Sequence, residues 1–254
     1  MPIQAVMFDL GDTLWHFPNF PDDTTYLAEA SRRVLSRLTA WGLGDGVVCD
    51  DLVLAIRRAD REQTHAAEHS HGRSPDFADL VRQCAAEYGI TLNRDQAESL
   101  WDAWNVGGVF YGRVLFPDSI PTLTELRRRG FKLGAVTNRS LGGHRFRDEL
   151  RDCGMLDLFD AYAISCDDGW LKPHPSLFRL AMESLHVRPD QTAMVGDNLR
   201  ADVMGAKALG MTAIWKRPPG VVQEPATLAN GALAEPDFTI DHPGELLALP
   251  ILQR

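Results

Sequence analysis

The sequence predicts an α/β protein, a Rossmann-like parallel sheet covered by helices on both faces, with an all-helical cap inserted near the N-terminus. Three observations lead to this fold class. Short apolar runs alternate with helix-length amphipathic segments in the second half of the chain, as in parallel strands joined by helices. Roughly ninety residues after the first apolar run show helical spacing and no strand pattern. Several apolar runs end directly in polar side chains, and parallel sheets bind ligands at the carboxyl ends of their strands.

The first predicted strand covers residues 5–8, an apolar run that ends at Asp9. A buried carboxylate is costly unless the protein uses it, so Asp9 marks a candidate site. The aromatic, Pro-rich stretch 15–21 predicts a connector. Apolar residues at helical spacing then predict helices near 24–41, 50–69, 74–89 and 93–105. We therefore predict a helical cap over 16–112, inserted into a core formed by 1–15 and 113–254.

The rest of the chain predicts the remainder of the core. Strands are expected at 131–136, 161–165, 192–195, 212–215 and 237–240. Helices are expected at 117–129, 142–152, 175–185, 199–209 and 243–249, several of them closed by a glycine. The stretch 217–236 is rich in Pro, Gly and Ala and predicts a surface loop.

Composition excludes several classes of protein. The 254 residues, 44% of them hydrophobic, suffice for one large domain or for a core with a smaller second domain. A net charge of −9 argues against nucleic-acid binding, which requires a basic face. Apolar runs of strand length predict no membrane span, and the N-terminus lacks the basic region of a signal peptide. The cysteines have no metal-like spacing, so we expect a cytoplasmic protein with reduced thiols.

Polar side chains gather where four predicted strands or their connections end. They are Asp9 with Asp12 and Thr13, then Thr137 and Asn138, then Lys172, and then Asp197 with Asp202. The carboxyl ends of parallel strands lie along one edge of a sheet, so we expect these groups to lie close together. Mg²⁺ prefers a few carboxylates and fills its coordination sphere with water and phosphate oxygens. The set therefore predicts a site that holds a hard cation and a phosphate together.

The same residues resemble the motifs of the haloacid dehalogenase-like hydrolase superfamily, in the family's order. The motifs are Asp9-Leu10-Gly11-Asp12-Thr13, Thr137-Asn138, Lys172-Pro173 and the segment from Gly196 to Asp202. The resemblance covers nearly the whole chain, with the helical cap between the first and second motifs. It implies a phosphatase-like hydrolase that uses Mg²⁺ and acts on a small phosphorylated molecule. Charge and hydropathy, as above, predict no nucleic-acid or membrane partner.

The resemblance also implies a role for each matching side chain. Asp9 is expected to be the nucleophile and to form an aspartyl intermediate. Thr137 and Asn138 are expected to bind the transferred phosphoryl group. Lys172 is expected to bind that group as well, and to neutralise charge on Asp9 and in the transition state.

A metal site is implied by the same resemblance. Its expected ligands are Asp9, the backbone carbonyl of Gly11, and Asp197. The supporting residues are expected to be Asp202, which supports the metal or holds Lys172, together with Thr13 and Asn198.

Gly11 departs from the family's phosphatases, which carry an Asp two residues after the nucleophile. That Asp protonates the leaving group and later activates water, a contribution of roughly 10²–10⁴-fold. Asp12 is expected to favour the turn instead, and His16 is a further candidate acid. Three hypotheses therefore stay open: a phosphatase impaired in acid–base catalysis, a 2-haloacid dehalogenase-type hydrolase, and a non-catalytic module of this fold that binds a ligand or regulates a partner.

Overall fold

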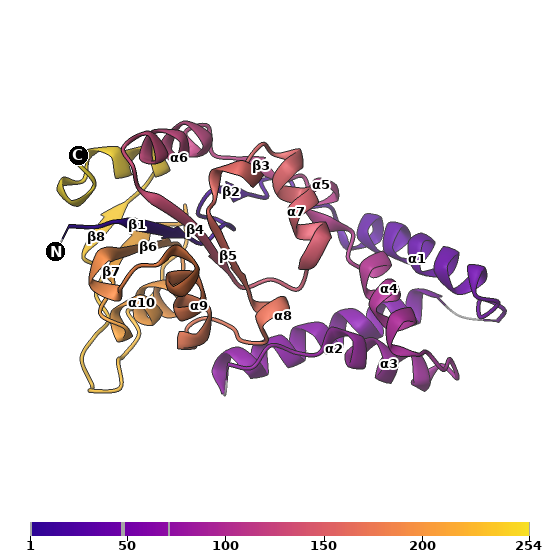
Figure 1. Ribbon diagram of the computed structural model, residues 1–254. Helices are drawn as coiled ribbons and strands as arrows, with labels where there is room; N and C mark the ends of the chain where they lie inside the picture. Colours follow the sequence, from indigo (N-terminus) through magenta and orange to yellow (C-terminus); the bar gives the residue numbers. More distant parts are fainter. Residues whose placement is uncertain (1, 47–48, 71, 254) are drawn as a thin grey trace. The chain divides into compact units, whose positions relative to one another are not determined.

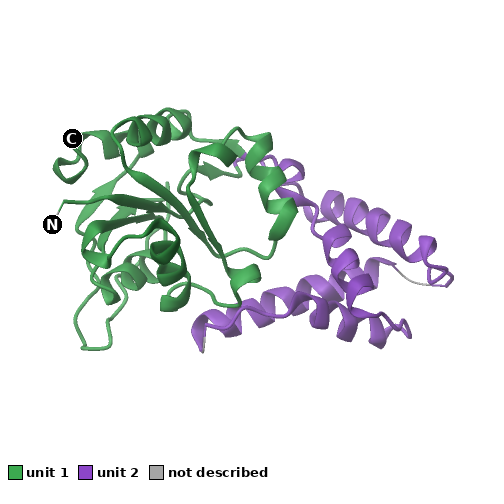
Figure 2. Cartoon of the chain, in the orientation of Figure 1, with its two compact units in different colours: residues 1–17, 114–254 green, residues 18–113 purple. Residues whose placement is uncertain are grey.

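The computed structural model describes residues 2–46, 49–70 and 72–253. The chain divides into two compact units, Met1–Phe17 with Val114–Arg254, and Pro18–Arg113 (Figure 2). The sequence-based division ends the first core segment at residue 15 and resumes it at residue 113. The boundaries differ because β2 (Trp15–His16) pairs with β3 (Val114–Leu115), which ties both short strands to the first unit.

The first unit is built on a parallel sheet of six strands, counted over the described residues (Figure 1). β1 (Ala5–Phe8) lies between β4 (Lys132–Thr137) and β6 (Thr192–Gly196). Outside them lie β5 (Ala161–Ile164) next to β4, and β7 (Thr212–Lys216) and then β8 (Phe238–Ile240) beyond β6. From β1 the chain adds β4 and β5 on one side and then β6, β7 and β8 on the other. The strand order therefore reverses its direction next to β1, and parallel sheets bind ligands at such a reversal. The α/β, Rossmann-like class predicted from the sequence is confirmed.

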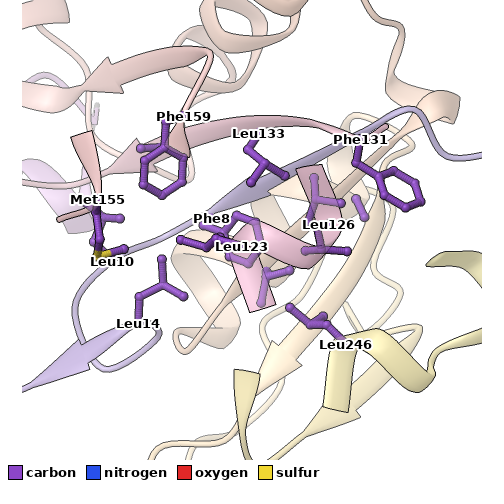
Figure 3. Packing of buried hydrophobic residues seen from close by; sticks show 14 of the residues in the cluster. Phe8, Leu10, Leu14, Leu123, Leu126, Phe131, Leu133, Met155, Phe159 and Leu246 are labelled. Atoms are coloured by element: carbon purple, nitrogen blue, oxygen red, sulfur yellow. The ribbon is translucent and has the colours of Figure 1, made fainter. Parts of the chain in front are cut away.

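Side chains of β1 alternate between two hydrophobic cores, one on each face of the sheet. Val6 and Phe8 pack with Leu123 and other helix residues in one core (Figure 3). Ala5 and Met7 belong to the other core. All of β1 is buried, because a parallel strand with helices on both faces has no solvent side. This burial explains why the run is continuously apolar.

Helices cover both faces of this sheet. α6 (Ser119–Arg128) and α7 (Gly143–Asp152) contribute to the core that contains Phe8, and α9 (Pro175–Leu185) and α10 (Gly205–Ala208) to the other. Shorter segments complete the unit: η1 (Leu156–Leu158), α8 (Ser165–Asp168), η2 (Pro189–Gln191), η3 (Leu199–Met204), η4 (Pro243–Ala248) and η5 (Pro250–Leu252).

Two predicted helices differ in kind from the expectation. The segment 199–209 begins as the π-helical η3 and continues as α10, because the carbonyl of Asn198 is shared between the amides of Asp202 and Val203. The segment 243–249 is the 3₁₀-helical η4. Hydrophobic spacing does not distinguish these tighter and wider turns from an α-helix.

Every named element in the described part of the second unit is a helix, and the unit has its own core. Its helices are α1 (Asp23–Ala40), α2 (Cys49–His69), α3 (Phe77–Glu87), α4 (Arg94–Trp104) and α5 (Gly107–Phe110). Side-chain caps at Asp22, Asp76 and Asn93 begin three of them. The buried apolar faces of α1 to α4 meet in one cluster that includes Leu38 and Leu100. Over the described parts of the whole chain, no helix combines the length and the apolarity needed to cross a bilayer.

Candidate active site

Three predicted site residues lie where adjacent strands end. Asp9 follows β1, Thr137 is the last residue of β4, and Asp197 follows β6. β1 is hydrogen-bonded to both β4 and β6 in parallel register, so these strand ends share one edge of the sheet. The backbone amide of Asp9 extends this pairing by donating to the carbonyl of Val195, at 2.9 Å. Strand order and register thus bring together side chains that are far apart in the sequence.

Lys172 lies at the centre of a buried ion-pair network. Its Nζ is 2.7 Å from Oδ1 of Asp9 and 2.6 Å from Oδ1 of Asp202. Lys172 is 2% exposed and Asp202 is 1% exposed, so solvent does not screen these charges. A buried charge is tolerated when it is paired and hydrogen-bonded, and loss of one partner leaves the other uncompensated. The structure therefore brings together three residues that the sequence singled out separately.

Two asparagines hold the backbone around this network. Oδ1 of Asn138 accepts from the backbone amide of Lys172 at 2.7 Å, and its Nδ2 donates to the carbonyl of Lys172 at 3.1 Å. The backbone amide of Asn198 donates to Oδ2 of Asp202 at 3.0 Å. The side chain of Asn198 accepts from two backbone amides of η3. The amide of Asn138 thus orients Lys172, and its expected contact with phosphate stays a prediction.

The carboxylates of this site outnumber its lysine. Burial, together with the charges of Asp9 and Asp202, raises the pKa of Asp197 to about 8. Burial also raises the pKa of Asp202 to about 6, although the ammonium of Lys172 opposes it. Burial alone would favour neutral Lys172, but the carboxylates of Asp202 and Asp9 outweigh it and hold the pKa of Lys172 above its usual range. The surplus of negative charge favours binding of a proton or a cation at Asp197.

The donor set fits a divalent metal ion. One carboxylate oxygen each from Asp9, Asp197 and Asp202 lies within 4.8 Å of the others. Carboxylate oxygens are the hard ligands that Mg²⁺ prefers. Both oxygens of Asp202 are already hydrogen-bonded, to Lys172 and to the amide of Asn198. Asp9 and Asp197 are therefore the more available metal ligands, and Asp202 acts on Lys172. The expected contribution of the Gly11 carbonyl stays a prediction.

The chain turns sharply after β1. The backbone amides of Leu14 and Trp15 both donate to the carbonyl of Leu10, at 2.8 and 3.2 Å. Asp12 has a φ of 50°, a left-handed conformation that Asp adopts more readily than most residues. At Gly11, by contrast, an added Cβ would meet nothing within 4 Å, and the backbone is not left-handed. Position 11 therefore has room for the Cβ of a side chain.

Two other predicted residues, Thr13 and Thr137, are buried, and His16 is half-buried. Thr137 is 2% exposed and Thr13 is fully buried. Within the described residues, Oγ1 of Thr13 has no hydrogen-bond partner. The ring of His16 stacks on Phe116, with 4.7 Å between ring centroids. The catalytic or supporting roles expected of these residues stay predictions.

Residues at the end of β7 and in the following loop adjoin the site without having been predicted. Nε1 of Trp215 and Nε2 of Gln223 donate to the carbonyl of Asp197, at 2.8 and 3.0 Å. Lys216 is fully buried with Nζ 3.9 Å from the centroid of the Phe116 ring, and Nζ has no hydrogen-bond partner in the described part of the chain. Burial lowers the pKa of Lys216, opposed mainly by the charge of Asp197. The sequence does mark Lys216, because it is a charged residue at the end of an apolar run, as Asp9 is. No pattern in the sequence marks Gln223.

Comparisons with known proteins agree with this geometry. Residues 3–210 match the family described as haloacid dehalogenase-like hydrolase. The glyceraldehyde 3-phosphate phosphatase of Methanopyrus kandleri is 32% identical over 246 residues, which are 96% of each chain. A solved HAD phosphatase from Thermococcus onnurineus is 26% identical with a TM-score of 0.57, and covers 97% of both chains. A solved 2-haloacid dehalogenase from Pseudomonas syringae is 25% identical with a TM-score of 0.65, at the same coverage.

The matched segment contains every residue of the ion-pair network, from Asp9 through Lys172 to Asp202, and covers far more than half of the chain. The chain is therefore a hydrolase that belongs to the haloacid dehalogenase-like family.

Proposed function

We propose that this protein is a Mg²⁺-dependent phosphatase that hydrolyses a small phosphorylated molecule through a phosphoryl intermediate on Asp9. The observation that carries the proposal is the buried contact of Lys172 with Asp9. Near this pair lies Asp197, whose carboxyl has a pKa raised by burial and by the neighbouring carboxylates. The carboxylates of such a site favour binding of a cation, and its lysine favours binding of a phosphoryl group. The phosphatase from Methanopyrus kandleri supports the same reaction class and makes glyceraldehyde 3-phosphate the first substrate to test.

The proposed reaction has two displacements at phosphorus. A carboxylate oxygen of Asp9 attacks phosphorus, the ester P–O bond breaks, and the leaving alcohol oxygen takes a proton. Water then attacks phosphorus, gives up a proton, and the bond to Asp9 breaks to release inorganic phosphate. Lys172 offsets the negative charge that builds up on the transferring group. Asp9 and Asp197 are the residues that would hold Mg²⁺, and the ion would supply Lewis-acid chemistry at the phosphate oxygens.

A haloacid dehalogenase-type reaction is the alternative. The absence of an Asp at position 11 and the similarity to a solved 2-haloacid dehalogenase favour it. The acidic cluster argues against it, because a reaction that proceeds without metal does not need the third carboxylate of Asp197. In either reaction we assign substrate selection to the helical unit Pro18–Arg113.

Purified protein would be assayed with glyceraldehyde 3-phosphate, an aryl phosphate and 2-haloacids, each with Mg²⁺ and with a chelator. We expect release of phosphate that requires Mg²⁺, and no release of halide. Asp9→Asn should abolish turnover and keep the fold, whereas Asp190→Asn, the same change at an exposed residue, should not alter it. Release of halide in the presence of chelator, or full turnover by Asp9→Asn, would overturn the proposal.

A further inference from the structure

The backbone of Asp197 is held by two side chains from outside its own strand. Its carbonyl accepts from Nε1 of Trp215 at 2.8 Å and from Nε2 of Gln223 at 3.0 Å. A carbonyl oxygen has two lone pairs, so these bonds complete its capacity as an acceptor. Oε1 of Gln223 also accepts from the backbone amide of Leu199 at 2.9 Å. One amide side chain therefore spans the backbone on both sides of Asn198.

The segment that Gln223 bridges joins the acidic residues of the site. Asp197 directly follows β6, and Asp202 lies within η3, which begins at Leu199. The packing there is tight, because a Cβ on Gly196 would come within 2.2 Å of the carboxyl group of Asp202. A small shift of the peptide after Asp197 therefore changes where its carboxylate points relative to Asp9 and Asp202.

Gln223 belongs to the long loop between β7 and β8 (Figure 1). The distal part of this loop is tied to itself, by the bridge between Thr227 and Leu233 and by the amide of Ala234 donating to Ala226 at 2.8 Å. Val222, next to Gln223, is 91% exposed. Long loops without regular structure are uncommon in compact domains and are usually functional. The contacts of Gln223 with Asp197 and Leu199 give this loop a direct connection to the site.

We propose that Gln223 is a positioning residue that fixes the backbone of Asp197 and thereby sets the affinity of the site for Mg²⁺. The inference rests on the proposed function, in which Asp197 is a metal ligand. Groups that orient metal ligands through hydrogen bonds commonly change metal affinity by roughly 10–100-fold when they are removed. Trp215 keeps one of the two bonds to the Asp197 carbonyl when Gln223 is replaced, so we expect the lower end of that range.

Gln223→Met tests this role because it keeps the length of the side chain and removes both hydrogen bonds. Trp215→Phe is an independent variant that removes only the indole donor and keeps an aromatic ring. Gln253→Met is the matched control, since Nε2 of Gln253 also donates to a backbone carbonyl, that of Leu247, at 2.7 Å. The dissociation constant of Mg²⁺ would be measured by calorimetry on metal-free protein, and thermal unfolding would be measured in chelator.

Gln223→Met should raise the dissociation constant of Mg²⁺ about tenfold, and excess Mg²⁺ should restore its turnover. Trp215→Phe should weaken Mg²⁺ binding in the same direction, and Gln253→Met should bind Mg²⁺ like the wild type. Unchanged Mg²⁺ affinity in Gln223→Met would overturn the inference and leave the proposed function intact. Weaker turnover that excess Mg²⁺ does not restore would also overturn it. A wild-type protein that does not bind Mg²⁺ would overturn the proposed function, and the inference with it.

Discussion

Exchanging the residues at positions 11 and 12, as Gly11→Asp with Asp12→Gly, should speed hydrolysis of phosphate esters. Position 11 accepts a side chain, because an added Cβ meets nothing within 4 Å. Position 12 has a φ of 50°, a conformation that glycine adopts freely and that Asp adopts less freely than glycine, although more readily than most residues. The exchange therefore favours the left-handed backbone at position 12, places the new Cβ at position 11 in open space and leaves the net charge unchanged.

The expected gain follows from the role of the missing carboxylate. A positioned acid–base group contributes roughly 10²–10⁴-fold, and we expect the double variant to gain at least about tenfold. The single change Gly11→Asp should gain less, because it adds a carboxylate to a site in which like charges already raise the pKa of Asp197. Asp12→Gly alone is the control for the backbone effect and should not speed turnover.

Stopped-flow measurements with an aryl phosphate at saturating Mg²⁺ would separate the two steps. An aryl leaving group needs little protonation, so the wild type should show a rapid burst followed by slow steady-state turnover. The double variant should raise the steady-state rate, because the new carboxylate can activate the water that attacks the intermediate. Equal steady-state rates for the double variant and the wild type, on every phosphate ester that binds, would refute the reasoning.

Three further predictions concern the charges and the packing of the site. Lys172→Met should lower the free energy of unfolding by about 3–5 kcal/mol in urea titrations, because it leaves buried Asp9 and Asp202 uncompensated; wild-type stability would contradict this. In metal-free protein, the free energy of unfolding should fall from about pH 4 to about pH 8, because over this range folded Asp197 keeps a proton that the unfolded chain has lost. Folded Asp202, whose raised pKa is about 6, adds to the fall only below that pH. The slope should reach at most about 1.4 kcal/mol per pH unit for each proton, and Asp197→Asn should flatten it; equal slopes would count against the raised pKa of Asp197. Gly196→Ala should destabilise the fold by about 1–3 kcal/mol, because the added Cβ would lie 2.2 Å from the carboxyl group of Asp202. Gly11→Ala is the control and should not destabilise the fold, so similar effects of the two changes would argue against tight packing at Gly196.

The parts of this fold that could be predicted from the sequence are those with strong local patterns. The continuous apolar run of β1 is required by burial on both faces, and the alternation of strands and helices specifies the parallel sheet. The order of the motifs predicted the family, which the comparisons confirm. The expectation that Asp9, Lys172 and Asp202 lie close together followed from their positions near the ends of parallel strands, and the structure places Nζ of Lys172 within hydrogen-bond distance of both carboxylates.

The parts that could not be predicted lack such patterns. β2 and β3 are two residues long, too short for a period to be visible. Asn138 gives no sign in the sequence that both ends of its amide bond the backbone of Lys172, thirty-four residues away. Gln223 lies in a loop of Pro, Gly and Ala, where composition predicts exposure and says nothing of a contact with Asp197. These contacts depend on tertiary structure alone.

The central claim is that Asp9 carries the phosphoryl group during turnover. The most direct measurement is mass spectrometry of protein quenched in acid during turnover of an aryl phosphate, in heavy-oxygen water with Mg²⁺. The account predicts a phosphoryl group on the peptide that contains Asp9, its absence in Asp9→Asn or with chelator, and heavy oxygen in the released phosphate. Heavy oxygen incorporated into the carboxylate of Asp9, as expected when water attacks a carboxyl ester, or turnover with no phosphoryl group on Asp9, would contradict the account.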